Sequence, residues 1–190
     1  MTSVITALMG LFILSGTGVG SAAWAATDTP AIISPLPSYS VTLTGYNAVP
    51  EQTDSDPFTT ASGAYSNPEV VAARSIDLAD KLPFGTVIAI EPSDTSDPNC
   101  GYPLVAQKVG LRVIADSMNP RMHDKVDLLF GTNATVQVGG EPRNAAIALG
   151  VCSGVRIVVV GHIDIAQIPK TQRELAQLIS GIGPALASAN

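Results

Sequence analysis

Residues 111–130 form the stretch LRVIADSMNPRMHDKVDLLF. Two apolar runs, at 111–116 and 126–130, are each long enough for one short strand, and the polar residues 117–125 separate them as a loop. The first run ends in Asp116 and the second contains Asp127. An acid within a strand is costly to bury unless it is hydrogen-bonded, protonated or lining a groove. The stretch therefore predicts two strands that carry a pair of acids.

The pattern alone leaves simpler roles open for both acids. Asp116 could cap the loop that follows it, and Asp127 could face solvent on an edge strand. Ionisable residues in strands are often solvated or paired. A catalytic role for either acid therefore needs further support.

Short β-rich runs recur on both sides of this stretch. Further strands are predicted at Ser40–Tyr46, Val70–Arg74, Thr86–Glu91, Thr135–Val138 and Arg156–Val160, with polar, turn-rich excursions at Pro50–Ser66 and Pro92–Pro103. Asn144–Gly150 predicts a short helix with Asn as its N-cap and Gly as its stop. Thr171–Ser180 predicts a second helix with one apolar face. Many short strands, long loops and little helix favour a small β-barrel over a βαβ sheet.

The N-terminus has the pattern of a secretory signal. The first 25 residues contain no charged side chain, run apolar from Ile5 to Leu14, and end in Ala23-Trp24-Ala25, which a signal peptidase accepts. A membrane anchor is the alternative, but the apolar run is shorter than the about 20 residues that a span needs. We expect a signal peptide at 1–25, a flexible segment at 26–38, a barrel domain at 39–168, and a C-terminal helix and tail at 169–190.

Composition narrows the class of ligand. The chain of 190 residues has a formal net charge of −6 and no basic cluster, which argues against nucleic acid and anionic lipid and favours a neutral, polar ligand. Dinucleotide-binding and phosphate-binding motifs are missing, and neither His nor Cys has ligand spacing, so no cofactor or metal is expected. Cys100 and Cys152 form an even pair in a chain expected to be exported, which predicts a disulfide.

Several ordered motifs resemble those of bacterial 3D (three-aspartate) domains. The motifs are Leu43-Thr44-Gly45-Tyr46, the segment from Gln52 to Gly63, Leu82-Pro83-Phe84-Gly85-Thr86, Asp116-Ser117-Met118-Asn119-Pro120-Arg121 and the run from Val126 to Phe130. The resemblance covers roughly residues 41–160. This family is similar to the catalytic domain of membrane-bound lytic transglycosylase A and to stationary-phase-survival muralytic proteins.

The resemblance implies a mainly β fold, a six-stranded double-psi β-barrel with one or two short helices. It implies binding of peptidoglycan glycan strands and cleavage of the β-1,4 bond between N-acetylmuramic acid and N-acetylglucosamine. From the signal pattern we expect export to the periplasm or cell envelope, with the extracellular space as the alternative. By the same match Asp127 is the catalytic acid and Asp116 its supporting aspartate. The third aspartate is Asp77 or Asp80, with Asp77 preferred. Thr60, Ser62 and Lys125 are the further candidates for substrate contacts.

This sequence also departs from the family pattern. The muralytic relatives carry a glycine-rich loop with a Lys between the two aspartates, where this chain has Ser117 to Asp124, and the segment Glu91 to Lys108 is an insertion relative to the shortest members. Three functions stay open: a lytic transglycosylase with one Asp as acid and base, a hydrolytic glycosidase, and a non-catalytic peptidoglycan-binding barrel. The sequence leaves the oligomeric state open.

Overall fold

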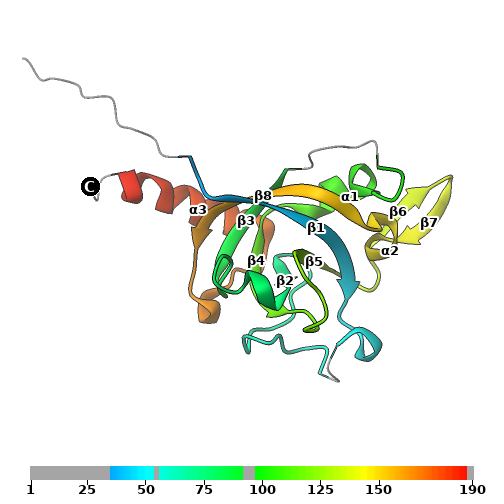
Figure 1. Cartoon of the computed structure of the whole chain (residues 1–190), viewed down its shortest axis with the longest axis horizontal. Helices are drawn as coiled ribbons and strands as arrows, with labels where there is room; N and C mark the ends of the chain where they lie inside the picture. Colours follow the sequence, from blue (N-terminus) through cyan, green and yellow to red (C-terminus); the bar gives the residue numbers. More distant parts are fainter. Residues whose placement is uncertain (1–34, 54–55, 92–96, 188–190) are drawn as a thin grey trace, which may run out of the picture. The chain divides into compact units, whose positions relative to one another are not determined.

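Six strands close into a barrel in the order β1-β5-β2-β4-β3-β8 (Figure 1). The structure is a computed structural model, and it describes residues 35–53, 56–91 and 97–187, with the side chains of 182–187 excepted. The expected signal peptide at 1–25 and most of the expected flexible segment lie outside the described residues. The mainly β, six-stranded fold class predicted from the sequence is confirmed.

The elements follow one another with short helices between the strands. The barrel strands are β1 (Ser38–Asn47), β2 (Val71–Arg74), β3 (Thr86–Glu91), β4 (Arg112–Ser117), β5 (Lys125–Phe130) and β8 (Cys152–His162). A separate hairpin is formed by β6 (Thr135–Val138) and β7 (Glu141–Asn144). The helices are α1 (Tyr102–Val109), α2 (Ala145–Leu149) and α3 (Gln172–Ala187), and single 3-10 turns lie at Pro50–Gln52, Ile76–Leu78 and Ile165–Gln167.

Two strand pairs interlock at the centre of the barrel. β5 lies between β1 and β2, parallel to β1 and antiparallel to β2. β2 in turn lies between β4 and β5 and is parallel to β4. Each consecutive pair, β1 with β2 and β4 with β5, therefore holds a strand of the other pair between its members. This reciprocal insertion is the double-psi arrangement.

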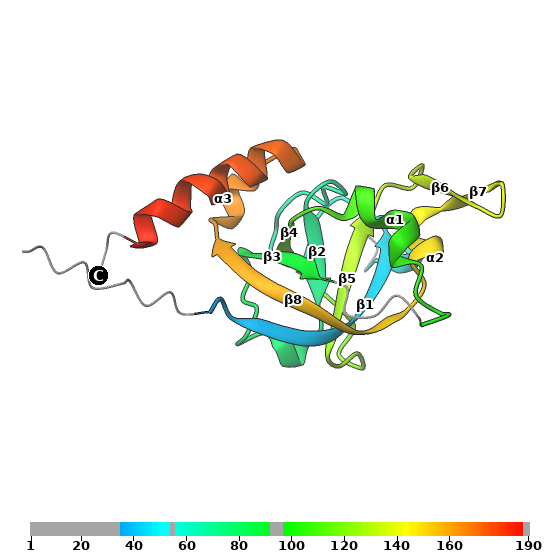
Figure 2. The same cartoon turned by 90° about the horizontal axis from the view of Figure 1, so that it is seen from above.

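Alternation along the strands divides the apolar side chains into two layers. One cluster, which includes Leu43, Ile114 and Leu128, fills the barrel interior. The other, which includes Val113 and Leu129, covers the outer side of β2, β4 and β5 and continues into residues after β8, among them Leu175 of α3. Figure 2 shows α3 lying alongside the end of β8.

Helix α1 and strand β7 were missed by the sequence prediction. Residues 92–103 were expected as an irregular excursion, but α1 begins at Tyr102 because Pro103 is tolerated in a first helical turn, and it ends before Gly110 at a positive φ of 55°. β7 has a polar, exposed sequence that contains Pro142, so it carries no apolar alternation. The described residues thus form three α-helices where one or two were predicted.

The two predicted helices are present. Asn144 caps α2 by accepting hydrogen bonds from the backbone N–H groups of Ala146 and Ile147, and Gly150 follows the helix with a positive φ of 64°. α3 runs beyond the predicted end at Ser180 to Ala187. Within the described residues, no helix is both long and apolar enough to cross a membrane.

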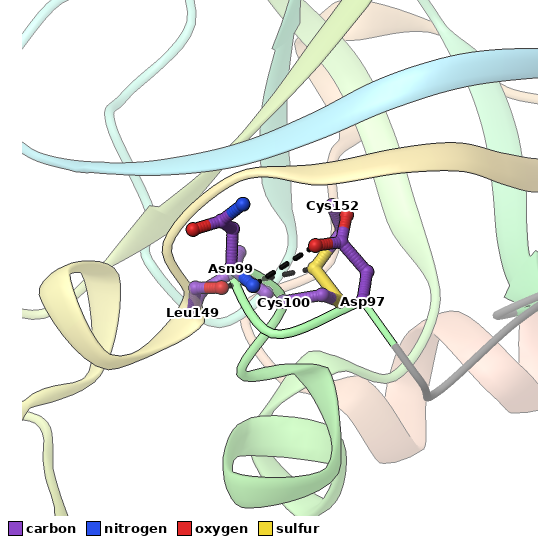
Figure 3. The surroundings of a disulfide bond; sticks show 5 residues. All are labelled: Asp97, Asn99, Cys100, Leu149 and Cys152. Carbon is purple, nitrogen blue, oxygen red and sulfur yellow. Dashed lines mark hydrogen bonds between the residues drawn. A yellow bond between two sulfur atoms is a disulfide. The ribbon is translucent and has the colours of Figure 1, made fainter.

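A disulfide joins Cys100, just before α1, to Cys152 at the start of β8, as predicted (Figure 3). The two Cα atoms lie 4.5 Å apart, and the bridge spans 52 residues of chain. Backbone hydrogen bonds hold the same junction: Cys100 N–H donates to the carbonyl of Asp97, and Gly101 N–H donates to that of Leu149. Such a bond is compatible with an exported protein.

Removal of this disulfide should lower the unfolding free energy and leave the folded structure in place. We expect the double variant Cys100→Ser/Cys152→Ser to lose about 4 kcal/mol of unfolding free energy, because the unfolded chain regains the entropy of an open loop. Denaturant titration of the oxidised protein and the variant measures the loss. Equal stability of the two proteins would show that the bridge does not constrain the unfolded chain.

A buried arginine ties the barrel strands to their connections. Arg112 of β4 is fully buried, and its guanidinium donates to five backbone carbonyls, those of Val109, Lys108, Pro68, Val71 and Leu129, at 2.8–3.3 Å. Burial lowers the pKa of Arg112 to about 10, which leaves it protonated at neutral pH. One side chain therefore links the end of α1, the segment before β2, β2 itself and β5.

We expect Arg112→Met to lower the unfolding free energy by about 3 kcal/mol or more, since it leaves buried carbonyls without a donor. Arg112→Lys should recover little, because an ammonium lacks the planar fork that reaches several carbonyls at once. Arg156→Met is the matched control: Arg156 pairs with Glu91 on the surface, where an ion pair is worth at most about 1 kcal/mol. Similar losses in the Arg112 and Arg156 variants would contradict the structural role of Arg112.

Candidate active site

The interlocked strands bring the two predicted aspartates into one row. Asp127 of β5 is in register with Thr44 of β1 on one side and with Ala73 of β2 on the other. Ala73 is also in register with Asp116 of β4. Residues in register on neighbouring strands point to the same side of a sheet. Thr44, Asp127 and Asp116 therefore share one side, with the small Ala73 between the two acids.

A β-bulge in β4 is required for this placement. The pairing of β2 with β4 shifts by one residue, because Ala72 pairs with Ile114 while Ala73 pairs with Asp116. Ala115, the unpaired residue, packs in the outer cluster, whereas Ile114 packs inside the barrel. Strict alternation would turn Asp116 inward like Ile114. The bulge turns Asp116 to the outer side, which is a common use of bulges near functional sites.

Both acids line one open pocket with a volume of about 450 Å³. Its wall is supplied by Tyr46, by the loop after β4 through Met118 and Asn119, and by the 59–66 segment through Thr59 and Ala61. Among the described residues that line it, Asp116 and Asp127 are the charged ones and none is basic. The pocket thus combines polar neutral groups with two acids, which suits an uncharged polar ligand such as a sugar.

Three donors fix the carboxylate of Asp116. The hydroxyl of Tyr46 donates to its Oδ2 at 2.9 Å, and the backbone N–H groups of Ala61 and Ser117 both donate to its Oδ1 at 2.9 Å. Burial and the nearby Asp116 carboxylate raise the pKa of Tyr46, so its hydroxyl keeps the proton that it donates. Asp116 is therefore held as a hydrogen-bond acceptor in one orientation.

Asp127 accepts fewer hydrogen bonds than Asp116, and burial raises its pKa. Its Oδ1 accepts a hydrogen bond from the hydroxyl of Thr44 at 2.8 Å, and its Oδ2 has no hydrogen-bond partner among the described residues. Burial raises the pKa of Asp127 to about 6, and the nearby charge of Asp116 acts in the same direction; Thr44 and Lys125 oppose it. A carboxyl in this state can exchange a proton near neutral pH.

The remaining candidates lie around the pocket and not in its wall. Asp77 accepts a hydrogen bond at 3.0 Å from the N–H of Asp124, which has an unusual positive φ of 50°, and its carboxylate lies 3.7 Å from His123. That hydrogen bond lowers the pKa of Asp77. Asp77 thus supports the loop between the two aspartates, while Asp80 makes no such contact with the described part of that loop. Lys125 lies at the end of the same loop, with its ammonium 3.7 Å from the sulfur of Met122.

Thr60 and Ser62 lie in the turn of a short hairpin in which Thr59 pairs with Tyr65. Their hydroxyls lie 3.0 Å apart, and the Thr60 hydroxyl also donates to the carbonyl of Ala64. These contacts tighten a turn whose backbone reaches Asp116 through Ala61. In this structure the backbone of the turn, rather than either hydroxyl, faces the acid.

Two polar residues at the acids were not predicted as site residues. Thr44 and Tyr46 lie two positions apart on β1, so they share a strand face, and both were part of the quoted Leu43–Tyr46 motif. Their spacing could have indicated a common face. The hydrogen bonds of Thr44 to Asp127 and of Tyr46 to Asp116 depend on the parallel register of β1 with β5, which local sequence does not specify.

Comparison of the chain with models of known protein families and with curated protein sequences finds no match.

Replacement of Asp127 should stabilise the protein in a pH-dependent way. Folded Asp127 holds its proton up to a pH of about 6, above the ordinary value of 3.8, so the contribution of Asp127 to wild-type stability becomes less favourable as the pH rises from about 4 to about 6. Asp127→Asn removes this loss and keeps an oxygen that can accept from Thr44. We expect the variant to gain up to about 3 kcal/mol over wild type between pH 4 and pH 7.

Denaturant titrations of both proteins at pH 4, 5.5 and 7 provide the measurement. Asp124→Asn, in the adjoining loop, is the control and should follow the wild type at every pH. A stability difference between wild type and Asp127→Asn that is the same at all three pH values would disprove the raised pKa.

Proposed function

We propose that this chain is a peptidoglycan lytic transglycosylase of the 3D-domain type, acting in the periplasm or cell envelope. The observation that carries the proposal is the pairing in one open pocket of a weakly held, partly buried Asp127 with a triply hydrogen-bonded Asp116. The interlocked barrel supports the family and the disulfide is compatible with the location.

The proposed reaction needs one acid that changes role. Protonated Asp127 donates its proton to the glycosidic oxygen as the bond from that oxygen to C1 of N-acetylmuramic acid breaks. The released carboxylate then accepts the proton of the C6 hydroxyl as that oxygen bonds to C1. The products are a 1,6-anhydro sugar and the free alcohol of the next sugar, and Asp127 ends protonated again. Asp127 has the two properties that this cycle requires, a raised pKa and an oxygen that accepts no hydrogen bond from the described residues.

The contacts of Asp116 favour this route over hydrolysis. A glycosidase needs a second carboxyl group that activates water or attacks the sugar. Both oxygens of Asp116 already accept hydrogen bonds from Tyr46, Ala61 and Ser117. A carboxyl group in this fixed orientation is positioned to stabilise the positive charge that develops at C1, and each of its oxygens already has a donor where a water molecule would have to bind.

The test is the digestion of purified cell-wall sacculi followed by mass spectrometry of the soluble products. We expect 1,6-anhydro-muramic ends from the wild type, and a rate lower by a factor of about 10²–10⁴ for Asp127→Asn, because general acid catalysis is lost. Asp124→Asn, which changes an acid in the loop before β5 and outside the pocket wall, should digest at the wild-type rate.

Other products would identify the alternatives. Reducing sugar ends would assign a hydrolase. Sacculi that are bound but never solubilised, by wild type and Asp127→Asn alike, would assign a binding barrel and remove the catalytic role of Asp127.

A further inference from the structure

The 58–66 hairpin separates the pocket of the two acids from a second pocket. Thr59 and Tyr65 pair across the hairpin, and the turn between them contains Gly63 at a positive φ of 83°. One side of the hairpin, through Thr59 and Ala61, lines the first pocket. The other side, residues 62–65, lines a cavity of about 560 Å³ whose far wall is formed by residues that follow β8.

The second pocket has the opposite charge from the first. Lys170 is the charged residue among the described residues that line it, and no Asp or Glu is among them. The Lys170 ammonium forms no ion pair with the described residues. Its backbone is fixed, because its carbonyl accepts a hydrogen bond from Asn67 at 3.0 Å and its N–H donates to Glu174 at 3.0 Å. The pocket thus holds a cation that forms no ion pair in the described part of the chain, on a segment anchored through Asn67 and the Glu174 carboxylate.

Apart from this lysine and the polar Ser62 and Asn67, the other residues that line this pocket are glycine, apolar or aromatic. Ile165 and Ile168 of the far wall lie opposite the hairpin, and Tyr65 leaves 68% of its surface exposed. A large exposed aromatic residue beside apolar side chains and a cation is typical of a binding surface for a chain with both apolar and acidic groups. A bare sugar would not use the positive charge.

We propose that the second pocket binds the short acidic peptide that branches from the glycan strand, with Lys170 contacting a peptide carboxylate and Tyr65 packing on the peptide. This inference rests on the proposed function, because the lactyl group of N-acetylmuramic acid carries such a peptide. The 58–66 hairpin lines both pockets, through Thr59 and Ala61 in the first and through residues 62–65 in the second, so a branch from a sugar in the first pocket has only this hairpin to cross. The chain would then prefer peptide-bearing over peptide-free strands.

The first experiment uses the peptide without any sugar, so that it does not depend on catalysis. The protein is titrated, by NMR chemical shifts, with a synthetic L-alanyl-γ-D-glutamyl-diaminopimelic acid peptide and with the same peptide after amidation of its carboxyl groups. We expect shifts at Tyr65 and Ile168 with the acidic peptide and weaker binding after amidation. Lys170→Gln should weaken binding about threefold, less at high salt, as for a solvent-exposed ion pair. Tyr65→Ala should weaken it about fivefold.

Lys108→Gln, which changes an exposed lysine of α1 outside this pocket, is the matched control and should bind as the wild type does. Absence of binding to the wild type, or equal binding by the wild type, Lys170→Gln and Tyr65→Ala, would overturn the inference.

The second experiment measures digestion of peptide-bearing sacculi and of sacculi stripped of peptides by an amidase. Lys170→Gln and Tyr65→Ala should raise KM on the first substrate and leave kcat and the second substrate unaffected. An equal effect on both substrates would overturn the inference while the proposed function stands. Peptide binding that depends on Lys170, together with no digestion of either substrate by the wild type, would support the peptide site and reject the proposed function.

Discussion

The antiparallel pairing of β2 with β5 is the constraint on which the rest of the structure depends. These two strands lie at the centre of the interlocked set, and each is also bound in parallel to a strand of the other pair. That arrangement places Ala73 between Asp127 and Asp116, from segments of chain that are otherwise unrelated. A methyl side chain there leaves room for both carboxyl groups, so the pocket follows directly from the way the strands cross.

The two acids then differ because of what surrounds them and not because of their own chemistry. Asp116, at the bulge, meets two backbone N–H groups and the Tyr46 hydroxyl, while Asp127, within a regular strand, meets a single Thr44 hydroxyl and is desolvated by burial. Fewer donors and greater desolvation favour the protonated form of a carboxyl group. The same barrel therefore supplies one anchored acceptor and one group that can exchange a proton.

Much of the barrel could be predicted from local pattern, because its six strands are short apolar runs bounded by polar turns. The N-cap of α2 at Asn144 and the disulfide were also predicted correctly from the sequence. The bulge at Ala115 could not be predicted, since it changes the direction of Asp116 without changing residue type. Helix α1 was not predicted, because the Pro and Gly residues at its ends are typical of turns and loops. The hydrogen bonds from Arg112 to five backbone carbonyls join segments that are distant in sequence. An arginine within a strand pattern does not predict them.

The disulfide has a consequence for proteolysis. Cys100 and Cys152 enclose both β4 and β5, and with them Asp116, Asp127 and the exposed loop between them. Exposed loops are the preferred sites of cleavage by proteases. A single cut in that loop would leave the two fragments covalently joined, with β4 and β5 each still paired in the barrel. In a protease-rich compartment the bridge would thus keep a nicked chain in one piece.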